Sequence, residues 1–464
     1  MKAKKALALI MALTMTASLA ACGSDKAEES TPAAAQPESA VAEEAAPADT
    51  AEAEGSEAAA AEEDATDYGG ITLTMMNSKP EIQDALEEVT ALWGDAHNVT
   101  FEVYETDSPA DMLAQRYAAG DPPALAIVDP GNVTEMGEER FLDLSGEDWV
   151  AVGGDTMGTK VNGVLYGFPL CVEAPGMVYN KTAIENVLGE EFVPENYSSP
   201  EAFQELLETL RAGGMENPVI LNQETWSLGG HLLGSNLFNF QDGTAEGSYQ
   251  FVEDIKGGAD VMENAMFQNL FQDYDLFIEY NINKDDPLAA DYDLNASYVA
   301  EGEAAFWING TWVWPDMSTY VDGSMDYGVM PIPKNDADMQ GKIYAFASKQ
   351  IVIDREVATE EQQAAAKEFL NWLVYSEEGQ SALVNDLEIV VAFTNNPNAP
   401  VNPVNAVLKT YIDAGNTVNN APFTLPTDHT SEMAPHMQAY LAGQETIEDV
   451  AAAITEYWQT HDPS

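Results

Sequence analysis

The sequence predicts an α/β protein built from two lobes. From residue 71 onwards, apolar residues recur first with the alternation of a strand and then with the spacing of a helix. This order of strand, helix and strand is typical of α/β folds with a parallel sheet. About 395 residues follow residue 67, and a chain of that length exceeds the usual size of one hydrophobic core, so we expect two lobes.

The folded part opens with three predicted strands separated by helices. We expect strands at residues 71–76, 98–104 and 124–128, and helices at residues 81–96 and 112–119. The third strand is wholly apolar, as a strand covered on both faces requires. In open α/β sheets, ligands bind beyond the carboxyl ends of the strands. The loops after Met76 and Val128 are therefore candidate binding loops.

The same alternation continues towards the end of the chain. We expect strands at residues 176–179, 218–221, 327–330 and 349–353, helices at residues 200–212 and 360–375, and mostly helix over residues 229–302 and 431–460. The loop after the strand that ends at Leu221 is a third candidate binding loop, by the same rule.

Residues 1–22 have the layout of a secretory signal: lysines at the start, an apolar run over residues 6–13 and small residues before Cys22. The apolar run is too short for a comfortable membrane span. The segment resembles the bacterial lipoprotein signal, in which the cysteine becomes the lipidated first residue of the mature chain, with palmitate among its acyl groups. The alternative is an ordinary secreted protein in which Cys22 is incidental.

Residues 23–67 consist largely of Ala, Glu, Pro and Ser and contain no aromatic residue. Such a segment cannot bury enough apolar surface to offset the entropy of ordering it. We therefore expect a disordered acidic tether, which spans roughly 35–40 Å on average.

The charge of the chain limits what it binds. It has 79 acidic and 18 basic side chains, for a formal net charge of −61. Nucleic acid is excluded as a partner because phosphate binding requires a basic surface. Acidic ligands are repelled unless lysines or arginines cluster locally. A neutral ligand fits this charge best, and a cationic ligand comes second.

The cysteines and histidines predict neither a disulfide nor a metal site. If Cys22 carries lipid, Cys171 has no partner, and a lone cysteine within an apolar stretch is more often a small buried residue than a nucleophile. The five histidines lack zinc-site spacing. The acidic stretch over residues 284–295 lacks the glycine and the final glutamate of an EF-hand loop. We expect no metal and no cofactor.

Residues 166–181, YGFPLCVEAPGMVYNK, resemble the extracellular solute-binding proteins of carbohydrate ABC importers (family 1), and the maltose/maltodextrin-binding branch most closely. Further matches follow in order: NQETW (222–226), AAFWINGTWVW (304–314), YGVMPIP (327–333), KEFLNWLVYSEEGQSAL (367–383) and QETIEDVAAAI (444–454). The resemblance implies a periplasmic-binding-protein-like fold, with two α/β lobes joined by a hinge and a sugar bound in the cleft between them. It implies an N-terminal lobe of residues 68–172 and 348–394, and a C-terminal lobe of residues 173–347 and 395–464.

The resemblance also identifies candidate ligand-binding residues. Glu173 matches a sugar-binding glutamate, Trp312 matches a tryptophan that stacks on a sugar ring, and Glu224 and Trp226 lie on a segment that lines the cleft. These residue types suit sugars independently, because a pyranose offers an apolar face to aromatic rings and a rim of hydroxyls to polar groups. The alternatives are a surface carboxylate for Glu173 and a core position for Trp312. We expect Trp307 and Trp314 in the core.

Two further loops match the family only in part. Asn77, Ser78 and Lys79 follow the first strand, where the family has a longer polar loop with a sugar-contacting lysine. Asp129 follows the third strand, where the family carries an aromatic residue and an Asp-Arg pair, but here the aromatic and the arginine are absent. Residues 427–433 also lack a cleft tryptophan of the maltodextrin branch. These departures argue against maltodextrin as the ligand.

The sequence thus predicts a monomeric, lipid-anchored protein on the outer face of a bacterial membrane. It is expected to capture a sugar, in the form of an oligosaccharide, for the permease subunits of an ABC importer, with no catalysis. One alternative is a binding protein for a neutral or cationic solute other than a sugar. Another is a surface glycoside hydrolase that uses Glu173 and Glu224 as its carboxylate pair, about 5–9.5 Å apart. A purely structural surface lipoprotein is a third alternative, although it needs no cleft.

Overall fold

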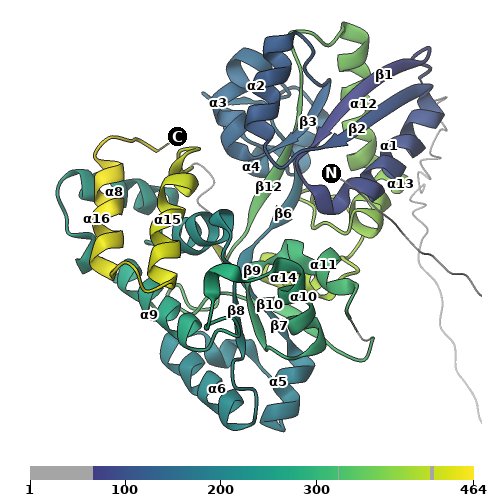
Figure 1. Ribbon diagram of the computed structural model, residues 1–464. Coiled ribbons are helices and arrows are strands. Elements are labelled where there is room, and N and C mark those ends of the chain that lie inside the picture. The colour runs from purple at the N-terminus through teal and green to yellow at the C-terminus, as the bar shows by residue number, and fades with distance from the viewer. Residues whose placement is uncertain (1–65, 322, 419–422, 464) are drawn as a thin grey trace, which may run out of the picture. The chain divides into compact units, whose positions relative to one another are not determined.

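The computed structural model describes residues 66–321, 323–418 and 423–463. The predicted signal peptide, Cys22 and residues 23–65 of the predicted tether lie outside these ranges. Within them, the predicted α/β class is confirmed: strands and helices alternate and build two main sheets, which we call the first and the second sheet (Figure 1). Among these residues, no helix combines the length and the apolar character needed to cross a bilayer.

The first sheet has five strands in the order β2-β1-β3-β12-β6. Its strands are β1 (Ile71–Asn77), β2 (Val99–Glu105), β3 (Leu125–Val128), β6 (Phe168–Glu173) and β12 (Phe346–Ile353). The surrounding elements are η1 (Pro80–Ile82), α1 (Gln83–His97), α2 (Pro109–Ala119), α3 (Pro130–Arg140), η2 (Asp148–Val152), α4 (Gly154–Met157), α12 (Glu360–Tyr375), α13 (Glu377–Ser381) and η8 (Ala382–Asp386), with a small hairpin of β4 (Lys160–Val161) and β5 (Val164–Leu165). Strand β1 runs parallel to β2 and β3, whereas β12 is antiparallel to β3 and β6.

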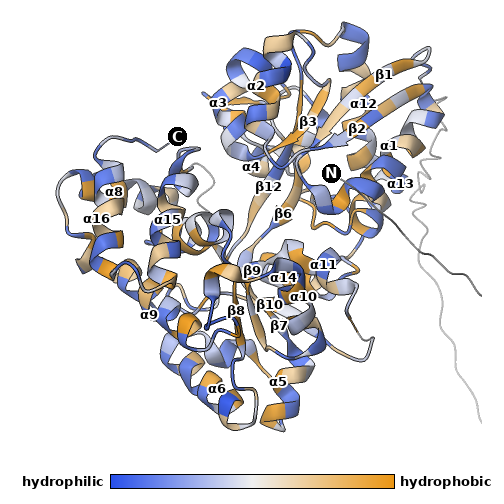
Figure 2. Ribbon diagram, in the orientation of Figure 1, coloured by the Kyte–Doolittle hydropathy of each residue, from blue (hydrophilic) through white to orange (hydrophobic). Residues whose placement is uncertain are grey.

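Helices cover both faces of the first sheet, which explains its apolar strands. On β3, Leu125 and Ile127 belong to the core shared with α1 and α12, while Ala126 and Val128 belong to the core shared with α2 and α3. Successive residues of a strand point to opposite faces, so a strand between two helical layers is apolar throughout. Figure 2 shows β3 in hydrophobic colours and helices such as α2 and α3 with polar residues towards solvent.

The second sheet has four strands in the order β10-β7-β9-β8. Its strands are β7 (Pro175–Asn180), β8 (Val219–Leu221), β9 (Phe306–Gly310) and β10 (Tyr327–Met330). The helices around it are α5 (Lys181–Leu188), η3 (Pro194–Tyr197), α6 (Pro200–Ala212), η4 (Trp226–Ser235), α7 (Asn236–Phe238), α8 (Ala245–Lys256), η5 (Val261–Glu263), α9 (Ala265–Glu279), η6 (Pro287–Ala289), α10 (Tyr292–Glu301), η7 (Thr311–Val313), α11 (Trp314–Ser318), α14 (Pro403–Asp413), α15 (His429–Leu441) and α16 (Ile447–Trp458). Strands β11 (Ile343–Tyr344) and β13 (Thr417–Val418) pair separately.

The periodicity of the sequence located most of these elements but did not predict α3. This helix, PGNVTEMGEER, buries only Asn132, Val133 and Gly137, so it lacks the apolar stripe by which a helix is recognised. It begins directly after Asp129, and Pro130 occupies its first position, where a missing N–H costs no hydrogen bond.

The strand directions place the candidate binding loops at two edges that are joined by the chain. Strands β1, β3 and β6 end at one edge of the first sheet, where the antiparallel β12 begins. Strands β8 and β9 end at one edge of the second sheet, where β7 begins. Only Ala174 separates the end of β6 from the start of β7. The two edges therefore meet at this crossing, within one compact unit, Asp64–Ser464. The residues that bound each lobe stay a prediction.

Candidate functional site

Charged residues from four strands gather at the edge of the first sheet. Lys79 follows β1, Asp129 follows β3, and Glu173 ends β6. The register of β12 brings its first residues to the same edge, because Phe346 pairs with Glu173 and Gln350 pairs with the last residue of β3. Residues far apart in the sequence thus form one polar cluster.

Lys79 and Glu173 form a buried ion pair at the centre of this cluster. Lys79 Nζ lies 2.6 Å from Glu173 Oε1 and 2.5 Å from Glu81 Oε1. The Ser348 hydroxyl donates a hydrogen bond to the other carboxylate oxygen of Glu173. Lys79 and Glu173 are only 3% and 8% exposed. Charges this deeply buried persist only when they are paired and hydrogen-bonded, as both are here.

The pair keeps both groups ionised despite burial. Burial alone raises the pKa of the Glu173 carboxyl, but the Lys79 ammonium, the hydrogen bonds from Lys79 and Ser348, and the charge of Lys349 hold it below its usual value. Burial likewise lowers the pKa of Lys79, and the carboxylates of Glu173 and Glu81 more than reverse that effect. Glu173 is therefore an ionised acceptor.

Of the other candidates on the first sheet, Asn77 supports the loop that carries Lys79, and Asp129 is partly exposed to solvent. The Asn77 side chain is fully buried; its oxygen accepts from the Lys79 backbone N–H at 2.8 Å, and its amide donates to the Lys79 carbonyl at 2.9 Å, so it holds the loop that carries Lys79. Lys349 Nζ donates to Asp129 Oδ1 at 2.6 Å and to Ser78 Oγ at 3.2 Å. The Asp129 side chain is half exposed.

Four rings gather at the edge of the second sheet. Trp226 lies edge-to-face with His231, Tyr292 and Trp312, at centroid distances of 5.7, 6.0 and 6.1 Å, and His231 lies 4.6 Å from Trp312. All four side chains are partly exposed. We call this group the aromatic cluster. Partly exposed ring faces are what an apolar sugar face packs on.

The local fold explains why His231 joins the cluster. Residues 226–235 form a π-helix, whose hydrogen bonds reach from residue i to i+5. In an α-helix, with about 3.6 residues per turn, residues five apart point in different directions. The wider turn brings Trp226 and His231 together. Burial lowers the pKa of His231 to about 4, so the ring is neutral near pH 7.

Trp312 depends on the glycine that precedes η7. A Cβ atom on Gly310 would lie 2.1–2.5 Å from ring atoms of Trp312, so any side chain there would displace the indole. Trp307, on β9, is fully buried, and its indole N–H donates to Asn222 Oδ1 at 2.7 Å. The prediction that Trp307 belongs to the core is confirmed, whereas Trp314 is only partly buried and packs against the same core.

Two further carboxylates lie beside the aromatic cluster. Glu224 accepts from the backbone N–H of Gln223 at 3.1 Å, and burial raises its pKa. The pKa of Asp316, on α11, is raised to about 6 by burial and by the charges of Glu81 and Asp293. Both carboxyls are thus harder to ionise than their free counterparts.

Electrostatics connects the two edges. The pKa of His231 responds to the charges of Glu173, Asp129 and Lys349, after the effect of burial. Glu81 follows β1 on the first sheet, and its charge raises the pKa of Asp316 beside the second sheet. The charges of the polar cluster therefore act on the aromatic cluster across the crossing of the two sheets, where Ala174 alone separates β6 from β7.

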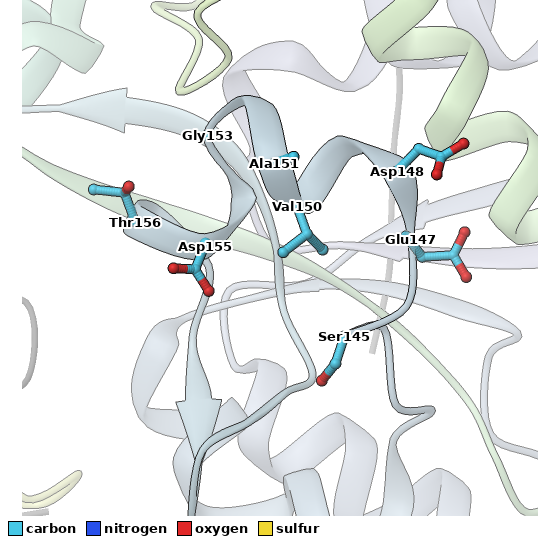
Figure 3. Close-up of a pocket in the computed structure, with 8 residues that line it drawn as sticks. All are labelled: Ser145, Glu147, Asp148, Val150, Ala151, Gly153, Asp155 and Thr156. Carbon is cyan, nitrogen blue, oxygen red and sulfur yellow. The ribbon is translucent and has the colours of Figure 1, made fainter.

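A cavity lies beside the aromatic cluster, and another is separate from both clusters. A narrow one is lined by Pro175, Gly176, Ser227, His231, Leu232, Asn236, Ile308, Asn309 and Ile332, and so opens beside the aromatic cluster. A larger one, of about 550 Å³, is lined by Ser145, Glu147, Asp148, Val150, Ala151, Gly153, Asp155 and Thr156 (Figure 3). It shares no residue with either cluster, and no aromatic ring lines it, so we place the candidate site at the clusters.

Sequence reasoning missed several residues that the structure brings to the site. They are Glu81, His231, Tyr292, Asn309, Asp316, Ser348 and Lys349. Ser348 and Lys349 lie in the first half of β12, which begins at Phe346, three residues before the predicted strand of residues 349–353. An antiparallel strand starts where its parallel neighbours end. Only the strand direction, which the sequence does not state, identifies them. Cys171, expected to be buried, is fully buried, and burial raises its pKa to about 12.

Solved structures with this fold cover most of the chain. RafE in complex with raffinose has a TM-score of 0.68 at 18% identity, over 84% of this chain and 98% of RafE. A family 1 extracellular solute-binding protein from Bifidobacterium longum subsp. infantis has a TM-score of 0.61 at 21% identity, over 84% and 99% of the chains. BlMnBP1 from Bifidobacterium animalis subsp. lactis, in complex with mannobiose, has a TM-score of 0.60 at 17% identity, over 84% and 93%.

A comparison with curated proteins finds no match. Residues 77–380 match the family described as bacterial extracellular solute-binding protein, and this range covers more than half of the 464 residues. It includes the second sheet, the first sheet except for residues 71–76 of β1, the polar cluster and the aromatic cluster. This chain therefore belongs to the bacterial extracellular solute-binding proteins.

Proposed function

We propose that this chain is the lipid-anchored substrate-binding component of an ABC importer and that its solute is a sugar, in the form of an oligosaccharide. Membership of the solute-binding family supports a binding role. Fold neighbours with raffinose and with mannobiose support a sugar as the solute class.

One observation carries the choice of a sugar: partly exposed rings stand within electrostatic reach of a fixed set of charged hydrogen-bonding groups. Trp226 and Trp312 offer faces to the C–H surface of a pyranose. Glu173 and Glu224 accept from its hydroxyls, and charge-assisted hydrogen bonds of this kind are the stronger ones. Lys79 donates to a sugar oxygen while it keeps Glu173 ionised.

In this proposal Asp129 contacts the solute directly, whereas Asn77 acts indirectly. Asp129 is half exposed and paired with Lys349, so it contributes a carboxylate at the rim of the site. Asn77 acts through the loop that it holds around Lys79. Solute that bridges the two sheet edges favours the closed form of the lobes, which the permease then recognises. The protein acts as a monomer without a cofactor.

The predicted signal and tether complete the proposal. Lipid on Cys22 holds the protein at the outer face of the membrane, and residues 23–67 give the folded part its reach. One acyl chain anchors only marginally, whereas two or three hold firmly.

We propose no turnover. A glycoside hydrolase needs one carboxyl that stays protonated as the general acid. The pKa of Glu173 is lowered and both its oxygens already have protein partners, so it is badly placed for that role.

A thermal-shift screen of neutral mono- and oligosaccharides, followed by calorimetry, tests the proposal. A sugar at about 100 times its dissociation constant adds about 2.7 kcal/mol of stability. We expect at least one oligosaccharide to stabilise the protein, and Trp312→Ala to weaken its binding. Trp372→Ala, at a partly buried ring on α12 that belongs to neither cluster, is the matched control. Stabilisation by non-sugar solutes alone would refute sugar as the solute class.

A further inference from the structure

Among the residues that the structure describes, the carboxylates of Asp316 and Glu224 form no ion pair, although the charge of Lys79 acts on Asp316 and lowers its pKa in part. Each ion pair of the site within these ranges belongs to Lys79 or to Lys349, and neither lysine pairs with these two groups. The Glu224 carboxylate accepts hydrogen bonds from its neighbour Gln223 and from its own backbone N–H, and neither donor carries a charge. Unpaired carboxylates that are partly buried are costly, so this part of the site favours a ligand that supplies positive charge.

Negative charge from both sheets meets at this point. The single ammonium of Lys79 is shared between Glu81 and Glu173. Glu81 still acts on Asp316 strongly enough to be the largest cause, after burial, of its raised pKa. Any closure that brings the two edges together therefore brings like charges together, and like charges disfavour the ionised state.

Asn309 is an independent sign of a missing partner. Its side chain is only 3% exposed, and within the part of the chain that the structure describes its Oδ1 has no hydrogen-bond partner. Its Nδ2 donates to the Tyr292 hydroxyl at 3.3 Å, so the free oxygen lies at the same end of the side chain, beside Tyr292. Tyr292 in turn feels the charges of Asp316 and Glu224. A buried acceptor without a donor is rare in native proteins.

All of these groups accept hydrogen bonds, and two are anionic. The rings of Trp226 and Tyr292 lie next to them, and aromatic faces also attract cations. A neutral hydroxyl would satisfy one acceptor but would leave the like charges uncompensated. A protonated amine has three donors and a positive charge, so it can donate hydrogen bonds to these acceptors and also compensate the negative charge of the carboxylates.

We propose that the solute carries a protonated amine, which binds between Tyr292, Asp316 and Asn309, so that the sugar is an amino sugar. This inference rests on the proposed function, because it places the amine at the same site. It specifies the solute class more narrowly than the family does.

Matched disaccharides test the charge directly. The glucosamine β-1,4 dimer, cellobiose and N,N′-diacetylchitobiose share a linkage but carry an amine, a hydroxyl and an acetamide at the same carbon. We extend the comparison with galactosamine against galactose and mannosamine against mannose. Binding to the purified protein is measured near pH 7 by thermal shift and calorimetry. We expect an amine to bind at least about tenfold more tightly than its neutral counterparts, as one charged hydrogen bond permits.

Asp316→Asn keeps the shape of the side chain and removes its charge. We expect this variant to lose about tenfold of the preference for the amine over the neutral sugars, whatever change it makes to the binding of both. Asn309→Leu removes the free acceptor and should also weaken amine binding. The control Glu205→Gln removes an exposed charge on α6 and should change neither affinity.

Each outcome decides the inference. Equal or tighter binding of the neutral sugars, or an amine preference that survives in Asp316→Asn, overturns the amine site and leaves sugar binding intact. A panel in which no amine binds also overturns the inference. Binding of putrescine, but of no sugar, with loss in Asp316→Asn would support the cationic site and refute the proposed sugar function.

Discussion

Replacing Lys79 by methionine tests the physical account of the polar cluster. The change keeps the length of the side chain and removes the ammonium that Glu173 and Glu81 share. Of its partners in the described ranges, Glu173, which is 8% exposed, then keeps only the Ser348 hydroxyl. An uncompensated carboxylate is left buried at the crossing between the two sheets.

Breaking a buried ion pair on one side costs about 3–5 kcal/mol, and we expect Lys79→Met to lower the free energy of unfolding by that amount. Glu173→Gln should cost less, because Lys79 would keep its pair with Glu81. The matched control is Lys409→Met, which breaks an exposed pair between Lys409 and Asp413 on α14. Exposed pairs contribute about 0–1 kcal/mol, so the control should be nearly neutral.

The pH dependence of this loss has a definite sign. In the native protein the pKa of Glu173 is lowered, so its stabilising effect is present above the usual glutamate pKa and is lost as the pH falls through the lowered value. In Lys79→Met, burial acts without the ammonium and raises that pKa. The penalty is then full above the raised pKa and shrinks as acid protonates Glu173.

Urea unfolding at about pH 7.5 and about pH 5 measures both effects. We expect a large loss of stability in Lys79→Met at the higher pH and a smaller loss at the lower pH. A loss below about 1 kcal/mol, or the same loss at both pH values, would refute the reasoning.

Three further predictions concern the site, the anchor and the charge. Trp312→Ala should weaken sugar binding about tenfold or more but destabilise the protein less than Trp307→Ala does. Loss of the core ring of Trp307 should lower the free energy of unfolding by about 3–5 kcal/mol. Melting temperatures and affinities of both variants test this. Cys22→Ser should release the protein from membranes after cell breakage, and a variant that stays fully membrane-bound and is normally processed would contradict lipidation. Because the net charge is −61, raising NaCl from about 0.01 M to about 0.15 M should raise the melting temperature, and an unchanged or falling value would contradict a repulsive surface.

The sequence alone determined the class of fold and the loops that carry the site. The wholly apolar run at residues 124–128 becomes β3, buried on both faces, because hydrophobic periodicity depends only on near neighbours in the chain. Helix α6 was also predicted from local sequence, since Ser199 caps its first turn and Pro200 begins it. The ends of such strands indicated the regions of Lys79, Asp129 and Glu224.

Only the tertiary structure decided which side chains act together. Lys79 and Glu173 are 94 residues apart in the sequence, and Glu173 and Ser348 are 175 residues apart. No local sequence pattern can therefore predict that these side chains are in contact. The direction of β12 brings Lys349 to Asp129, and a π-helical turn brings His231 to Trp226. Burial then sets the charge states, because it depends on everything that packs around a group rather than on its neighbours in the chain.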